Sequence, residues 1–215
     1  MNRNIGVLIF LSVLGMGLSG CEAVQSIGQS IESINWPKAN TANTAESAQQ
    51  PSMTVNGQTQ VVKLPDNCPQ LKVLGELSEI TQFSTPKKPI ADELIAAAKF
   101  STLDATCQVS PNSVTLEISL DFDGILGPVG MKNGASEANY TYPYFLSVIT
   151  PQGQILSKDV FALSMVYSEG QPAIHKQDRL RQTIPLMVGQ DSGQFQIVVG
   201  FQLNEDELSY NRMKK

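Results

Sequence analysis

Two nine-residue stretches in which apolar residues occupy every second position constrain the fold of this chain more than any other feature. The first, "VTLEISLDF", begins at Val114, and the second, "FQIVVGFQL", begins at Phe195. Their apolar members are Val114, Leu116, Ile118, Leu120 and Phe122, then Phe195, Ile197, Val199, Phe201 and Leu203. A period of two is that of a β-strand with one buried face, whereas a helix repeats its apolar residues every three or four positions. We therefore expect the core to be built from β-sheet.

Further strand candidates and turn signals extend this pattern over residues 61–215. The candidates are "CPQLKVLGELSEITQF", "STLDATCQV", "YPYFLSVIT", "QILSKDVFALSMVY" and "DRLRQTIPL". Pro111 and Asn112 mark a turn before the first alternating stretch, and Pro151 to Gly153 mark another. About seven short antiparallel strands at this spacing favour an all-β domain, an immunoglobulin-like or fibronectin-like sandwich.

Three segments of the domain need separate interpretation. In residues 155–166 apolar side chains occur at both odd-numbered and even-numbered positions, which predicts a bulge or burial on both faces. Residues 89–100 are ambiguous, because their alanines favour a helical turn and their position favours a strand. At the end, Asn204 is expected to cap a short helix whose acidic residues lie at its positive end. Leu208 is expected to dock that helix, with Arg212, Lys214 and Lys215 beyond its last turn.

The amino-terminal segment reads as a secretion signal. After Arg3, residues 5–18 form an uncharged apolar run of about 14 residues, shorter than the roughly 20 that a membrane-spanning helix needs. The following Leu18, Ser19, Gly20 and Cys21 resemble the lipobox of bacterial lipoproteins. This resemblance implies removal of residues 1–20, and a diacylglycerol and a further acyl chain, typically palmitate, on Cys21. Glu22 then implies the outer membrane. The domain is expected to face the periplasm, and the cell surface is the alternative. The alternative is an ordinary signal peptide that happens to contain a cysteine.

Residues 21–60 are expected to connect this anchor to the domain. Val24, Ile27, Ile31 and Ile34 are spaced by three or four residues, which predicts a short amphipathic helix over residues 21–36. The alternative for this segment is a poorly ordered stalk. Residues 37–60 are rich in Ala, Thr, Asn, Gln and Ser, and too few of them are large and apolar to offset the entropy of ordering. We therefore expect a flexible linker there.

Cysteine usage and charge limit the other possibilities. If Cys21 is lipidated, Cys68 and Cys107 remain as a pair in an oxidising compartment, and a disulfide is expected. The alternative is two buried free thiols. Loss of residues 1–20 would remove Arg3 and leave 14 basic against 20 acidic residues, a net charge of −6. An acidic chain without basic runs argues against binding to nucleic acid.

No constellation for catalysis, a cofactor or a metal stands out. His175 is the one histidine, and it could approach Asp178 on a turn, but nothing resembles a nucleophile elbow. Asp121 and Asp123 in "DFDG" suggest calcium, yet the further oxygen ligands of a calcium loop are missing. We therefore interpret His175 as a loop residue and Asp123 with Gly124 as a turn. The protein is not expected to be an enzyme.

A glycine-rich stretch followed by tyrosines is the candidate interaction site. "GILGPVGMKNG" is expected to form a long mobile loop that carries Gly127 and Pro128. Tyr140, Tyr142 and Tyr144 follow it, and tyrosine is enriched at protein interfaces. Packing in the core remains the alternative for at least half of the aromatic residues.

The set "NCPQL", "ITQF", "GPVG", "YPYF", "VFALSM", "RQTIPL" and "GFQLNEDELSYNR" resembles a family of uncharacterised lipoproteins of Gram-negative bacteria. The likeness covers most of residues 66–212 and implies an immunoglobulin-like or fibronectin-like sandwich without an established activity. The expected function is that of an envelope lipoprotein acting as a protein-interaction or structural module, accessory to an assembly or secretion system. The alternative is a module that binds a glycan, peptidoglycan or a small ligand.

Overall fold

The computed structural model describes residues 52–54, 58–86 and 89–214. The expected signal peptide, lipidated Cys21 and amphipathic helix over residues 21–36 lie outside the described residues. Two mainly antiparallel sheets and one short carboxy-terminal helix make up most of the described part, so the expected all-β sandwich is confirmed at this level.

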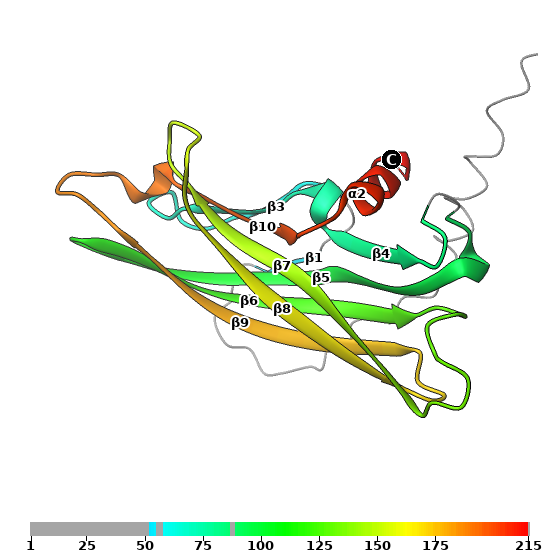
Figure 1. Ribbon diagram of the computed structural model, residues 1–215. Coiled ribbons are helices and arrows are strands. Elements are labelled where there is room, and N and C mark those ends of the chain that lie inside the picture. Colours follow the sequence, from blue (N-terminus) through cyan, green and yellow to red (C-terminus); the bar gives the residue numbers. More distant parts are fainter. Residues whose placement is uncertain (1–51, 55–57, 87–88, 215) are drawn as a thin grey trace, which may run out of the picture.

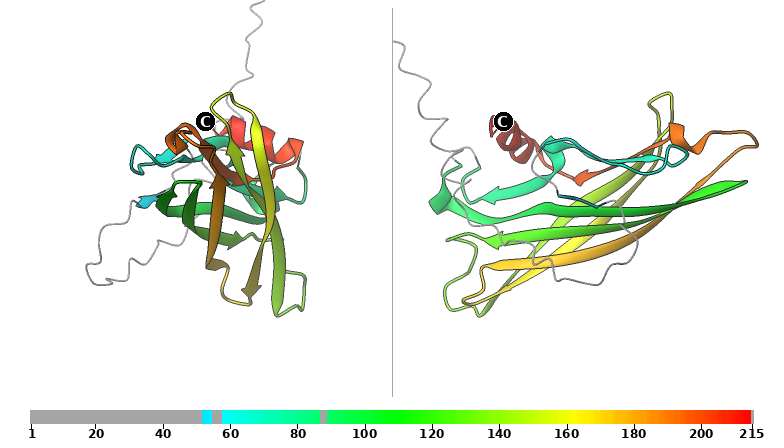
Figure 2. Two further views of the ribbon diagram at one scale, coloured as in Figure 1. Left: turned by 90° about the vertical axis from the view of Figure 1, so that its left-hand side faces the viewer. Right: turned by 180° about the vertical axis from the view of Figure 1, so that it is seen from behind.

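The first sheet has the strand order β1-β5-β6-β9, and β4 pairs with the same edge of β5 as β1. Its strands are β1 (Ser52–Thr54), β4 (Glu79–Phe83), β5 (Leu94–Ser110), β6 (Ser113–Leu126) and β9 (Ala173–Pro185). β5, β6 and β9 are long and lie side by side (Figure 2).

The second sheet has the strand order β2-β3-β10-β7-β8. Its strands are β2 (Gln60–Val62), β3 (Gln70–Val73), β10 (Gln196–Phe201), β7 (Glu137–Ile149) and β8 (Ile155–Ser168). β3 and β10 are parallel, and the other pairs are antiparallel. β7 and β8 run obliquely across the long strands of the first sheet (Figure 1).

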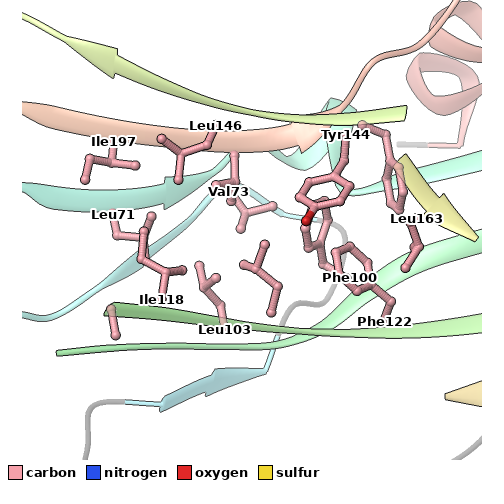
Figure 3. Packing of buried hydrophobic residues seen from close by; sticks show 14 of the residues in the cluster. Leu71, Val73, Phe100, Leu103, Ile118, Phe122, Tyr144, Leu146, Leu163 and Ile197 are labelled. Carbon is pink, nitrogen blue, oxygen red and sulfur yellow. The ribbon is translucent and has the colours of Figure 1, made fainter. Parts of the chain in front are cut away.

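The core lies between the two sheets, as the alternating stretches predict. Side chains such as Ile118 and Phe122 from β6 meet Leu146 from β7 and Ile197 from β10 (Figure 3). A group of aromatic rings fills one part of this core, with the rings of Phe100 and Phe122 4.8 Å apart between centroids. Burial of large apolar side chains at about 25 cal/mol per Å² is the main force that holds the sheets together.

Both predicted turns are present. Pro111 and Asn112 connect β5 to β6, and the amide of Gly153 donates to the carbonyl of Thr150 (2.9 Å) between β7 and β8. Gly153 has a φ of +80°, which glycine adopts without the steric cost that a Cβ brings. The register of β7 and β8 shifts next to this turn, at Ile149.

The ambiguous segment is mostly strand, and part of the expected linker is strand as well. Residues 89–100 form a short 3₁₀ turn, Ala91–Glu93, and then enter β5, because their alanines pack at the centre of the sheet. The expected linker over residues 37–60 is wrong at its carboxy-terminal end, since β1 pairs with β5 and β2 begins at Gln60. Two other 3₁₀ turns, Gly75–Leu77 and Ser192–Gln194, flank β3 and β10.

Helix α2 (Glu205–Met213) begins where the sequence predicts. The Asn204 side chain accepts a hydrogen bond from the amide of Glu207, and the Glu207 carboxylate accepts one from the amide of Asn204, each at 2.9 Å. This capping box satisfies two amides that the helix itself leaves without partners. Glu207, Tyr210 and Asn211 are the buried residues, so they dock the helix rather than Leu208, which is only partly buried.

The expected disulfide is present. Cys68, in the turn that precedes β3, is bonded to Cys107 in β5, with the two Cα atoms 6.3 Å apart. The bond therefore joins the two sheets near the start of the domain.

Candidate interaction surface

The predicted tyrosine patch does not lie on the surface. Tyr142 and Tyr144 are 0% exposed, because their side chains point inward from β7 into the aromatic part of the core. Burial raises the pKa of both hydroxyls well above the ordinary value, so these groups are held neutral. Tyr140 is partly buried and donates a hydrogen bond to the carbonyl of Gly130 (2.6 Å).

The glycine-rich stretch is not a long free loop. β6 continues to Leu126, and the amide of Gly127 then donates to the carbonyl of Ile95 (2.8 Å). Gly127 is buried, and a Cβ there would lie 2.0 Å from the carbonyl oxygen of Leu94. Pro128 is exposed on the tight turn that follows. The glycine is therefore explained by close backbone packing rather than by partner binding.

His175 does not approach Asp178, and Asp123 is not in a turn. All three residues lie within strands, Asp123 in β6 and the other two in β9. The side chain of His175 points outward from β9, whereas that of Asp178 points inward. His175 Nδ1 is 2.9 Å from Asp123 Oδ1, and His175 Nε2 is 3.5 Å from Asp121 Oδ1. Lys99 of β5 lies opposite Asp123 of β6. Burial lowers the pKa of Lys99, and the nearby carboxylates of Asp123 and Glu79 offset part of this decrease.

These residues belong to a polar ladder along the outer face of the first sheet. Gln177 donates to Asp121 (2.9 Å), Arg181 pairs with Glu117 (3.2 Å), and the hydroxyls of Thr115 and Thr183 are 3.1 Å apart. Such cross-strand pairs each stabilise a sheet by a few tenths of a kcal/mol, to roughly 1 kcal/mol. His175 is therefore one pairing residue in this ladder. Within the described ranges, no group of three His, Cys, Asp or Glu side chains is arranged to hold a metal ion.

The free edges of the two sheets differ sharply in how they are protected. β1, β2 and β4 are edge strands of only three to five residues, and Asn211 of α2 donates to the carbonyls of Glu76 and Glu79 beside β4. β9 is long but carries Lys176, Arg179 and Arg181. Short length, a covering helix and charged side chains are the usual protection of a sheet edge against pairing with another chain.

β8 is the exception. It has 14 residues, it ends the second sheet, and no strand in the described part of the chain pairs with its outer edge. Its sequence from Val160 to Val166, "VFALSMV", contains no charge, no proline and no glycine. A segment of this kind on an unpaired edge is ready to form a sheet with another chain.

From Val160 to Val166 the outward face of β8 is uncharged, largely apolar and exposed, and Lys158 precedes this segment in the same row. Leu156, Val160 and Val166 are 52%, 53% and 40% exposed, and Ala162 and Ser164 between them are also exposed. The inward residues Leu163 and Met165 are buried in the core. Both parities of this strand are thus apolar although only one face is covered.

The hydrogen-bonding direction of β8 follows from its neighbours. The amide of Gln202 donates to the carbonyl of Pro143, so the odd-numbered residues of β7 bond to the β10 side. Because successive residues point their backbone groups to opposite sides, Tyr142 and Tyr144 bond to β8, opposite Leu163 and Phe161. The alternate residues of β8, which include Ala162 and Ser164, therefore direct their N–H and C=O groups to the open edge.

A shallow cleft of about 240 Å³ lies beside α2. Its walls are apolar at Phe83, Pro86 and Ile95 and polar at Gln82 and Glu207. Gln82 donates to Glu207 across this cleft (3.5 Å). Its volume is below the roughly 300–1,000 Å³ of most small-molecule sites.

Comparison with family models, with curated proteins and with solved structures finds no match to this chain. Among the residues that the structure describes, no helix has the length and apolar character needed to span a membrane.

The sequence predictions do not include the β8 edge, although residues 155–166 carry a signal of it. Mixed parity over residues 155–166 predicts either a bulge or burial on both faces. The structure has the bulge, but beyond it the outward residues are exposed. A two-sided apolar strand that ends a sheet is the pattern that marks such an edge.

Proposed function

We propose that this protein is an envelope lipoprotein whose sandwich domain binds another protein chain through the edge of β8. The observation that carries this proposal is the exposed, uncharged segment Val160–Val166 on an unpaired strand. Addition of a strand to a sheet edge is a recurrent mode of protein recognition, in which main-chain hydrogen bonds give affinity and alternate side chains give specificity.

A charge-insertion variant tests the surface. Val160→Lys with Val166→Lys places two charges in the outward row of β8 without changing the core. Thr106→Lys with Gln108→Lys is the matched control, because both residues are exposed and lie in the outward row of β5. Cross-linking in intact cells should give adducts with the wild type and the control, and markedly fewer with the β8 variant. Equal adducts from the two variants would exclude β8 as the interaction surface.

The anchor is proposed from the lipobox resemblance of residues 18–21 and places the domain at the outer membrane, on its periplasmic side. Two or more acyl chains give stable attachment, at about 0.8 kcal/mol per buried methylene, whereas one chain is marginal. A disulfide between Cys68 and Cys107 is in keeping with a compartment outside the cytoplasm. Cys21→Ser should move the protein from the membrane fraction to the soluble fraction, and an unchanged distribution would contradict lipidation.

We also propose that the domain is an immunoglobulin-like or fibronectin-like sandwich in the broad sense. Two mainly antiparallel sheets that pack face to face support this assignment. The hairpin of β5 and β6 within one sheet and the parallel pair of β3 and β10 define its particular strand arrangement.

Binding of a glycan, a peptidoglycan fragment or another small ligand is the second candidate, and the cleft beside α2 is the observation that favours it. A ligand with a hydrogen-bond donor would suit Glu207, and an apolar part would suit Phe83 and Ile95. Ligands that bind only the native state raise its melting temperature. A thermal-shift screen of muropeptides and small amines tests this candidate, and an unchanged melting temperature at millimolar concentrations would count against it.

A further inference from the structure

The partner that best fits the β8 edge is a second copy of the same chain. This inference rests on the proposed function, because it names the partner for the same edge. In a twofold-symmetric dimer the same surface lies on both subunits, so a strand that pairs with itself must be compatible with its own reversed sequence.

β8 meets this condition. When two uncharged segments Val160–Val166 overlap fully in antiparallel register, Val160 lies opposite Val166 and Ala162 lies opposite Ser164. Lys158 then faces Ser168 of the second copy, next to Glu169, and Asp159 faces Tyr167. No like charges oppose each other, and apolar or β-branched pairs across two strands are stabilising.

The backbone is also suited to this pairing. Ala162 and Ser164 both direct N–H and C=O groups to the open edge, as the register of β7 with β10 and β8 shows. In the register above, residues with outward backbone groups face each other, which is the arrangement that antiparallel hydrogen-bonded pairs require.

The other long edge does not meet the condition. β9 carries His175, Lys176, Arg179 and Arg181 against a single acidic residue, Asp178. Pairing of β9 with itself would bring like charges together, which is destabilising. The charges that protect β9 and their absence from Val160–Val166 together direct self-association to one edge.

We infer that two copies of this chain associate by antiparallel pairing of β8 with β8, so that their second sheets become one continuous sheet. The association would place the outward row Val160, Ala162, Ser164 and Val166 at its centre.

A site-specific photocrosslink in the full-length protein tests this directly. A benzophenone amino acid at position 162 is irradiated in intact cells, and the products are separated by mass and identified. The expected product has about twice the mass of the chain and contains only its peptides. The same photoreactive residue at Thr106, exposed on β5, should give little or none.

Two substitutions at Ser164 then test the strand pairing. Ser164→Pro removes an N–H from the open edge but none from the ladder with β7, since proline is tolerated at the free side of an edge strand. Ser164→Ala keeps the N–H and, like Ser164→Pro, loses the hydroxyl bond to Asn139. The product should fall at least several-fold with proline and persist with alanine.

The outcomes separate the inference from the proposed function. An adduct at position 162 with a different protein would overturn the second copy as partner and leave the proposed function standing. No adduct at all would overturn both. A doubled-mass product that is equally strong with Ser164→Pro would show that copies meet without strand pairing, which also overturns the inference. If Ser164→Pro lowers the melting temperature strongly, the double variant Val160→Lys with Val166→Lys takes its place and should abolish the doubled-mass product.

Discussion

The hydroxyl of Tyr144 donates a hydrogen bond to the carboxylate of Asp178, with 2.5 Å between the oxygens. Tyr144 lies in β7 of the second sheet, and Asp178 lies in β9 of the first. The Tyr144 ring also stacks on Phe161 of β8, with the centroids 5.2 Å apart. One side chain therefore connects three strands on the side of the sandwich where β8 and β9 are both free edges.

Tyr144→Phe should destabilise the domain by about 1.5–3 kcal/mol, the typical contribution of a hydrogen bond to a charged group. The ring and its packing are kept, so the loss reports the hydroxyl alone. Urea denaturation gives the change as a shift in midpoint. Tyr140→Phe is the matched control, because its hydroxyl donates to the neutral carbonyl of Gly130, and it should cost less. An equal cost for both variants would contradict a special role of the bond to Asp178.

The sequence predicts the central strands well, because their pattern depends on local periodicity. Val114 to Phe122 alternate with a single buried face, and the structure places them at the centre of the first sheet. The cap at Asn204 is equally local, since its partner Glu207 is three residues away. Such features do not require knowledge of which strands are neighbours.

The surface could not be predicted in this way, because exposure depends on which strands end each sheet. Tyr142 and Tyr144 stand among Thr141, Pro143 and Phe145, so both faces of this strand carry large apolar side chains and the pattern does not say which face is covered. They are buried because the first sheet covers the face of β7 from which they point, and Phe122 of β6 lies against Tyr144 there. Val160 and Val166 show the reverse case, since apolar residues at these positions would be buried if another layer covered the second sheet.

The disulfide should contribute strongly to stability. The bond between Cys68 and Cys107 closes a loop of 39 positions, for which the chain-entropy model gives about 4 kcal/mol. The double variant Cys68→Ser, Cys107→Ser removes the bond without leaving a free thiol. Its denaturation midpoint should equal that of the reduced wild type. Equal stability of the oxidised wild type and the double variant would contradict this role.

Alkaline pH should unfold the domain steeply. Burial raises the pKa of Tyr142, Tyr144 and Tyr210, and it raises that of Tyr167 to about 12. Above pH 10 the unfolded chain releases these phenolic protons while the folded chain keeps them, so stability falls as pH rises. Four such groups correspond to about 5 kcal/mol per pH unit.

Absorbance at 295 nm, which follows tyrosinate, measures this alkaline transition. Four of the five tyrosines should ionise together with the loss of circular dichroism. Independent ionisation of these four groups near pH 10 in a folded domain would contradict the burial of their hydroxyls.

Asp104 should oppose folding at neutral pH. Its Oδ1 atom is buried without a hydrogen-bond partner within the part of the chain that the structure describes, and burial, followed by the nearby charge of Asp121, raises the pKa of this carboxyl. Between the ordinary pKa of about 4 and the raised value, the folded state holds a proton that the unfolded state has released. The contribution of this group to stability therefore falls as pH rises through that interval and stays lower above it.

Asp104→Asn should thus raise the denaturation midpoint at pH 7, and the gain should disappear at pH 3, where wild-type Asp104 is protonated in both states. Glu117→Gln is the matched control, since Glu117 is an exposed carboxylate of the same sheet that pairs with Arg181. Its removal should change stability by less than about 1 kcal/mol and in the opposite direction. Because the two variants remove the same charge, a gain from both would assign the effect to net charge rather than to the burial of Asp104. A loss of stability with Asp104→Asn at pH 7 would show that this carboxylate is well satisfied in the folded protein.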